Sequence, residues 1–150
     1  MKNKKILLVS SSGGHFVQLN LLLECLKDVD IIVVSTYPKK PLTIDSLQYF
    51  SIIDFSRDDP WKIIKVFRQC IRILVNNKPD LVLTTGAAPG FVMLIAAKII
   101  NIKGIWLDSI ANSKQLSLSG KLAKKFGFTV LSQWREVAVK SKVLYRGRLI

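Results

Sequence analysis

Two glycines and the only histidine of the chain follow its first apolar run, in the segment Ser10-Ser11-Ser12-Gly13-Gly14-His15. Glycines let the backbone approach a ligand closely, and the free amides at the start of a helix attract anions, so this pattern favours binding of a phosphate or diphosphate. The imidazole of His15 could donate a hydrogen bond to a phosphate oxygen or accept a proton from a sugar hydroxyl, and it could equally cap or pack the helix. The spacing is not GxGxxG and no acidic residue ends the second apolar run, so NAD binding is disfavoured.

Two further turns carry small or polar residues after an apolar run. The first, Thr84-Thr85-Gly86-Ala87, offers small side chains on which a ligand can lie, although close packing of a strand against a helix explains it equally well. The second, Asp108-Ser109-Ile110-Ala111-Asn112, carries a carboxylate that could act as a base, bind a sugar hydroxyl or cap the next helix. The candidate catalytic residues are therefore His15 and Asp108, and the candidate ligand contacts in these two turns are Thr85, Gly86, Ala87, Ser109 and Asn112.

Apolar runs and helical spacings alternate along the whole chain. Continuous apolar runs are typical of strands that are covered on both faces of a parallel sheet. We expect strands at residues 6–9, 31–34, 50–55, 80–84, 104–107, 128–131 and 143–145, and helices at 15–27, 61–76 and 89–100. This alternation predicts an α/β fold, a Rossmann-like doubly wound parallel sheet with right-handed crossovers. Ligands of such sheets bind outside the carboxyl ends of the strands, which selects the loops after residues 9, 84 and 107.

Length and composition favour one globular domain, residues 1–150, since about half of the chain is apolar and no repeat is visible. The cysteines, Cys25 and Cys70, show no CxxC spacing and no neighbouring cluster of ligands, so we expect buried thiols, no disulfide framework and no metal site. We also expect no cofactor. The formal charge of +13 favours a polyanionic partner, which could be nucleic acid, an anionic membrane or a phosphate-bearing substrate.

Five sequence motifs occur in a characteristic order. They are Ser11-Ser12-Gly13-Gly14-His15, residues 85–90, residues 106–112 leading into 116–121, Gln133-Trp134, and Tyr145-Arg146-Gly147. Together they resemble the oligosaccharide-biosynthesis family of the membrane-recruiting subunit of the asparagine-linked glycosylation pathway and its bacterial PssD-type relatives. The similarity covers residues 6–149.

This resemblance implies the N-terminal, acceptor-side half of a split GT-B glycosyltransferase similar to MurG. In such enzymes the first glycine-rich loop is thought to face the diphosphate of a polyprenyl-linked acceptor, a role that Ser12, Gly13, Gly14 and His15 would inherit, with Ser11 beside them. The UDP-sugar would be bound by a separate GT-B C-terminal subunit. We therefore expect this chain to be inactive alone and to act in capsule or exopolysaccharide biosynthesis.

The predicted helix at residues 61–76 gathers basic residues within one arc. A tryptophan beside them suits an anionic bilayer surface, although the solvated face of a helix packed on the core explains the pattern equally well. The arc consists of Trp61, Lys62, Lys65, Arg68 and Arg72. We expect no signal peptide and no span, and hence a cytoplasmic protein bound peripherally to the inner face of the cell membrane.

Two other functions are compatible with the composition. A nucleic-acid-binding domain is supported by the many lysines and arginines of the last third, and a free-standing nucleotide-binding domain is supported by the predicted sheet. No helix-turn-helix, zinc-ligand or RNP signature is recognisable, and nucleic-acid binding leaves the glycine loops unexplained. We therefore expect no nucleic-acid partner.

Overall fold

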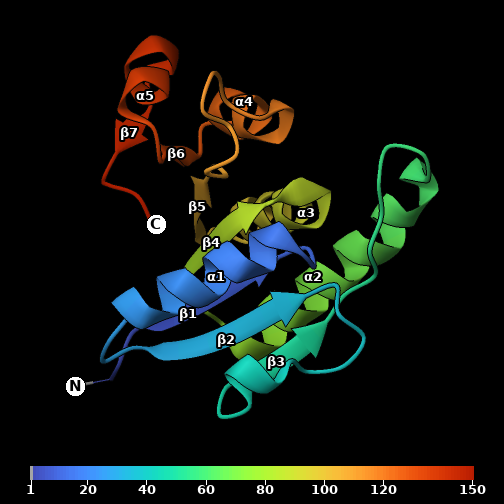
Figure 1. Ribbon diagram of the computed structural model, residues 1–150. Coiled ribbons are helices and arrows are strands. Elements are labelled where there is room, and N and C mark those ends of the chain that lie inside the picture. The colour runs from blue at the N-terminus through green and yellow to red at the C-terminus, as the bar shows by residue number, and fades with distance from the viewer. Residues whose placement is uncertain (1) are drawn as a thin grey trace.

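The computed structural model describes residues 2–150 and folds them into one seven-stranded sheet with helices on both faces (Figure 1). All paired strands are parallel, and the order is β3-β2-β1-β4-β5-β6-β7. The strands are β1 (Lys5–Ser10), β2 (Asp30–Ser35), β3 (Gln48–Ser51), β4 (Leu81–Gly86), β5 (Lys103–Leu107), β6 (Thr129–Ser132) and β7 (Leu144–Tyr145). The predicted α/β, Rossmann-like doubly wound fold is confirmed.

The helices include three long ones and several short ones. The long helices are α1 (Gly14–Cys25), α2 (Ile63–Asn77) and α3 (Ala87–Ile99). The short elements are the 3-10 helices η1 (Leu42–Ile44) and η2 (Pro60–Lys62), and the α-helices α4 (Leu118–Lys125) and α5 (Arg135–Ser141). No bounds were predicted for α4 or α5, because each is too short to show a clear helical repeat of apolar residues.

Successive residues of the central strands point to opposite faces of the sheet, and both faces are covered. Leu8 packs with Phe16 and Leu19 of α1, whereas Leu7 and Val9 belong to the larger core cluster that includes residues of α2 and α3. Leu7, Leu8 and Val9 are all fully buried, which explains why the strand reads as a continuous apolar run.

The structure corrects three local expectations. The strand expected at residues 50–55 ends at Ser51, because the amide of Ile53 donates to the Gln69 side chain at 2.9 Å instead of to a strand. The helix expected from Trp61 begins with the 3-10 turn of η2, and the α-helix starts at Ile63. Of the two cysteines, Cys70 is buried as expected but Cys25 is exposed at the end of α1.

The position of β1 next to β4 sets the location of the site. From β1 the chain crosses to β2 on one side, whereas from β4 it crosses to β5 on the other side. At this switch point the loops that leave the two strands diverge and open a crevice at the carboxyl edge of the sheet, which is where ligands of doubly wound sheets bind.

Candidate functional site

A pocket of about 320 Å³ lies at this carboxyl edge. It brings together residues from the turns after β1, β4 and β5 that the sequence singles out, namely His15, Gly86, Ala87, Asp108, Ser109 and Asn112. The other candidates, Ser11, Ser12, Gly13, Gly14 and Thr85, do not line it. Arg57, Trp106 and Ser117 also line the pocket, although the sequence assigned them no role.

His15 lies directly on the backbone of the turn after β4. Its Nδ1 is 3.0 Å from the carbonyl oxygen of Thr85, and the Thr85 hydroxyl donates to the carbonyl of His15 at 2.7 Å. Gly86, with φ +134°, leaves room for the ring, because a Cβ at this position would be 2.5 Å from Nδ1. A carbonyl only accepts hydrogen bonds, so Nδ1 carries a proton and, in the neutral ring, Nε2 keeps its lone pair. Nε2 is therefore the ring atom left for a ligand.

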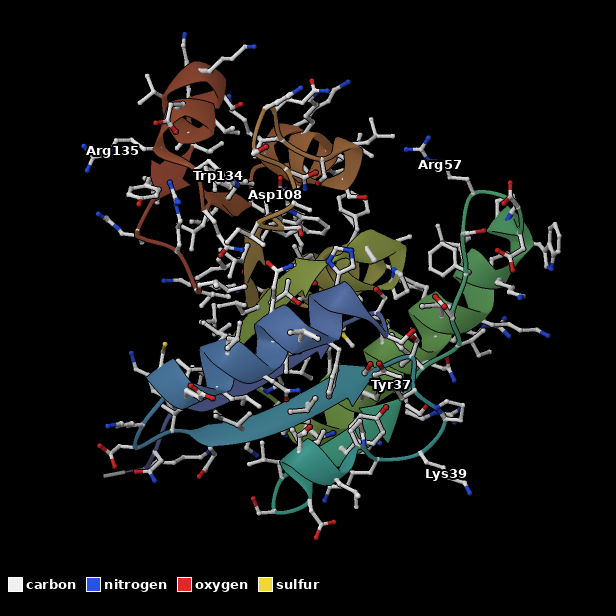
Figure 2. All side chains as sticks on the ribbon, viewed as in Figure 1. Tyr37, Lys39, Arg57, Asp108, Trp134 and Arg135 are labelled. Atoms are coloured by element: carbon white, nitrogen blue, oxygen red, sulfur yellow. The ribbon has the colours of Figure 1, made fainter. Side chains whose placement is uncertain are left out.

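Two backbone amides of the first loop donate to side chains of another loop, and the next two do not. Ser12 donates its amide to the Thr36 hydroxyl at 2.9 Å, and Gly13 donates to the Tyr37 hydroxyl at 3.0 Å (Tyr37 is labelled in Figure 2). Within residues 2–150 the amides of Gly14 and His15 have no acceptor. A ligand anion at this helix start would meet those two amides rather than the two that precede them.

Asp108 is buried at the end of β5 and its carboxylate accepts four hydrogen bonds. Oδ1 accepts from the Trp106 indole at 2.9 Å and from the Ser117 hydroxyl at 2.5 Å. Oδ2 accepts from the Ser117 amide at 2.9 Å and from the Asn112 side chain at 3.1 Å. The Ser117 hydroxyl also caps α4 by accepting from the Gly120 amide. This arrangement ties the loop after β5 and the start of α4 to one carboxylate, and a catalytic role of Asp108 stays a prediction.

A pair of buried glutamines also holds the loop after β5. Gln18 of α1 donates to the Ser109 hydroxyl at 2.9 Å and accepts the Ile110 amide at 3.1 Å. Gln133 donates to the Gln18 oxygen at 2.7 Å and to the carbonyl of Asp108 at 3.0 Å. The sequence offered a weak signal for this network. Gln133 belongs to the Gln133-Trp134 motif, and Gln18 is a polar residue in an apolar helix.

The arc of residues expected to face a membrane lies on η2 and α2. Trp61 is 68% exposed, and Lys65, Arg68 and Arg72 are also exposed. Lys62 differs from the other three basic residues because it pairs with Asp59 at 2.5 Å.

An apolar groove adjoins this arc. Ile63 and Ile64 are also exposed, and Ile64 reaches 61%. They form one wall of an apolar groove of about 290 Å³, which Phe67 continues and which Phe91, Val92 and Ile95 of α3 close.

Within residues 2–150 no helix is long and apolar enough to cross a bilayer. In the same residues no three His, Cys, Asp or Glu side chains are grouped so that they could hold a metal ion.

Comparison with known proteins assigns the family. The model of the family described as "Oligosaccharide biosynthesis protein Alg14 like" matches residues 56–149. The chain belongs to the Alg14-like family. A relative from Yarrowia lipolytica, UDP-N-acetylglucosamine transferase subunit ALG14, is 22% identical over 99% of this chain and 82% of its own length. The resemblance seen in the motifs is thereby confirmed.

Solved structures similar to this Alg14-like chain share its fold. MurG of Acinetobacter baumannii superposes with a TM-score of 0.72 at 14% identity, over 91% of this chain and 42% of MurG. A glycosyltransferase of Rickettsia africae gives a TM-score of 0.68 at 16% identity, over 99% of this chain and 44% of that protein. The chain therefore spans about two fifths of these structures. A putative UDP-N-acetylglucosamine 2-epimerase of Listeria monocytogenes gives 0.69 at 12% identity, so the fold occurs with more than one reaction.

Proposed function

We propose that this chain is the acceptor-binding subunit of a two-component UDP-sugar glycosyltransferase that acts on a polyprenyl-diphosphate-linked saccharide in capsule or exopolysaccharide biosynthesis. The observation that carries the proposal is the His15 ring, whose Nδ1 faces the Thr85 carbonyl while the ring lines the pocket at the switch point. Membership of the Alg14-like family and the structural similarity to two glycosyltransferases supply the reaction class.

In this proposal His15 is the base. A hydroxyl of the acceptor sugar attacks the anomeric carbon of the donor sugar, and the bond from that carbon to the leaving UDP breaks. The hydroxyl proton passes to Nε2 of His15, while the positive charge that develops on the ring is stabilised by the Thr85 carbonyl at Nδ1. Proton transfer of this kind contributes on the order of 10²–10⁴-fold to the rate.

Asp108 has a different role in this proposal. Both of its oxygens already accept two hydrogen bonds, so a proton taken from a substrate would have to displace a donor. We assign Asp108 to positioning, because it holds Asn112 and Ser117 at the pocket wall. Ser109 and Asn112 supply the hydroxyl and amide groups that a saccharide would contact.

The donor-binding partner is proposed from the relatives. The Yarrowia protein is named as a subunit of a UDP-N-acetylglucosamine transferase, and the MurG-like structures are more than twice as long as this chain. We propose a second polypeptide of the GT-B C-terminal type that binds the UDP-sugar and closes over the carboxyl edge of the sheet. The two chains would share the active site, and this chain would contribute the acceptor side.

The proposed location is the inner face of the cell membrane, with peripheral attachment. The exposed side chains of Trp61 and Ile64 suit insertion among lipid headgroups, and Lys65, Arg68 and Arg72 suit attraction to anionic lipids. Lys62 contributes less in this proposal, because Asp59 already neutralises it. Attachment by this surface would leave the adjoining pocket close to a lipid-linked acceptor.

A reconstitution assay tests the proposal. The chain, a candidate GT-B C-terminal subunit, and both together are incubated with a labelled UDP-sugar and a short-chain polyprenyl-diphosphate saccharide. We expect transfer only when both polypeptides are present. Robust transfer by this chain alone would contradict the two-component assignment. A salt-sensitive shift of short duplexes without acceptor binding would favour the nucleic-acid alternative.

A further inference from the structure

The lining of the pocket contains one residue with a permanent positive charge, Arg57, among the described residues. Arg57 lies in the loop between β3 and η2, and Figure 2 shows its side chain extending from that loop toward α4, with Asp108 beyond. Nothing in residues 2–150 forms an ion pair with Arg57, since the one ion pair found there joins Lys62 to Asp59. The pocket therefore has at its mouth a cation that forms no ion pair.

The loop presents Arg57 on a fixed turn. The Asp59 carboxylate accepts the Ser56 amide at 2.7 Å, the Asp58 amide donates to the Ser56 hydroxyl at 3.2 Å, and the Asp59 amide donates to the Ser56 carbonyl at 3.3 Å. Phe55, on the other side of the turn, packs against the main core cluster. Because both sides of the tip are anchored, the backbone of Arg57 is held in place although its side chain is free.

The carboxylates near this guanidinium form no ion pair with it. Asp108 is occupied by four hydrogen bonds from Trp106, Asn112 and Ser117, and Asp59 is paired with Lys62. Asp58 is exposed beside Arg57 in sequence and makes no ion pair with it among the described residues. A planar guanidinium that is weakly hydrated and unpaired at the mouth of a polar pocket matches the geometry of a phosphate, which it can bind with two parallel hydrogen bonds.

We infer that Arg57 binds the diphosphate of the lipid-linked acceptor and thereby sets which end of that acceptor enters the pocket. The inference rests on the proposed function. With the anion held at Arg57, the saccharide points inward toward His15 and the hydroxyls of the loop after β5, which also line the pocket. The lipid is then directed outward along the apolar groove lined by Ile63, Ile64 and Phe67. These residues follow the Arg57 loop closely in the sequence. Arg57 is in this sense a substrate-binding residue.

The test measures binding to the full chain by calorimetry. The probes are a short-chain isoprenyl diphosphate that carries one sugar, the matching isoprenyl glycoside without phosphate, and UDP-N-acetylglucosamine. Arg57→Gln should weaken binding of the diphosphate about tenfold or more, as expected for loss of a charged hydrogen bond, and leave binding of the glycoside unchanged. Arg57→Lys should recover part of the loss, because it restores the charge without the planar fork.

Arg135→Gln is the matched control. It removes the same charge from α5, where Arg135 stacks on Tyr145 at 5.5 Å and does not line the pocket. Equal affinity of the wild type and Arg57→Gln for the diphosphate would overturn the role of Arg57 and leave the proposed function standing. A wild-type chain that binds UDP-N-acetylglucosamine but not the isoprenyl diphosphate would overturn both.

Discussion

The His15 side chain links the local backbone to the proposed chemistry. The Thr85 carbonyl fixes the proton on Nδ1, and the missing side chain of Gly86 provides the space that the ring occupies. The sequence identified His15 and Gly86 as separate candidates, but it did not show that one lies on the other. That contact depends on the pairing of β1 with β4, which joins residues about 70 positions apart.

The proposed base and the proposed positioning residue should fail in different ways. His15→Ala removes a half-buried ring that makes one hydrogen bond, so stability should change little while kcat of the assembled pair falls about 10²-fold or more.

Asp108→Asn turns an acceptor into a donor that faces existing donors, and should lower the free energy of unfolding by about 1–3 kcal/mol. Urea unfolding and transfer kinetics on both variants check this. An Asp108→Asn variant of normal stability without activity would instead favour a catalytic Asp108.

Substitutions of the two glycines of the first loop should have different effects, one on stability and the other on acceptor binding. Gly13 has φ +81° and ψ −140°, a conformation close to the region reserved for glycine, so Gly13→Ala should destabilise the protein by about 1–3 kcal/mol. A Cβ at Gly14 would meet nothing within 4 Å and its φ is not positive, so Gly14→Val should fold normally. We expect Gly14→Val to lose acceptor binding, because its side chain enters the space in front of the free amides. Normal acceptor binding by a folded Gly14→Val would mean that the acceptor does not contact these amides.

At the level of helices and strands, the sequence predicted most of what positions the site. The apolar runs located every strand except for the ends of β3, and the runs are clearest for the central strands β1, β2 and β4, whose residues are mostly buried. The sequence did not predict the hydrogen bonds between the first loop and the residues after β2. There the hydroxyls of Thr36 and Tyr37 accept from the amides of Ser12 and Gly13. Side chains of one loop that satisfy the backbone of another leave no periodic trace in a sequence.

The exposed part of α2 gives a prediction about membrane attachment. Ile64→Asp should reduce binding to liposomes that contain anionic lipid by about tenfold or more, because it places a charge where an apolar side chain would be buried. Val139→Asp is the control, since Val139 is 73% exposed but lies on α5. Flotation with liposomes measures both variants. Equal flotation of Ile64→Asp and the wild type would remove this part of α2 from the membrane face.

The two cysteines should differ in reactivity. Burial raises the pKa of the Cys70 thiol to about 12, so near neutral pH it stays protonated and enclosed, whereas Cys25 is exposed. A maleimide reagent should label one cysteine per native chain rapidly and the second only after denaturation. Peptide mapping identifies the labelled residue. Rapid labelling of Cys70 in the native state would mean that α2 does not pack on the sheet as described.

For the whole molecule, the fold explains why one edge of the sheet carries the candidate chemistry. The parallel strands end together, so the turns after β1, β4 and β5 meet in one pocket while the helices cover the faces (Figure 1). The strand pattern singled out these three loops, and residues from all three line the pocket. It missed Arg57, because that residue lies in an irregular loop without a motif and reaches the pocket only through the path of the chain from β3 to α2.

The most direct test of the account compares the affinity of the unmodified chain for the two substrates of the proposed reaction. A short-chain polyprenyl-diphosphate saccharide and a UDP-sugar are each titrated into the purified chain, without a partner and without a membrane. The account predicts saturable binding of the lipid-linked saccharide that Gly14→Val weakens, and no measurable binding of the UDP-sugar. Tight binding of the UDP-sugar with none of the lipid-linked saccharide would contradict the assignment of this chain to the acceptor side.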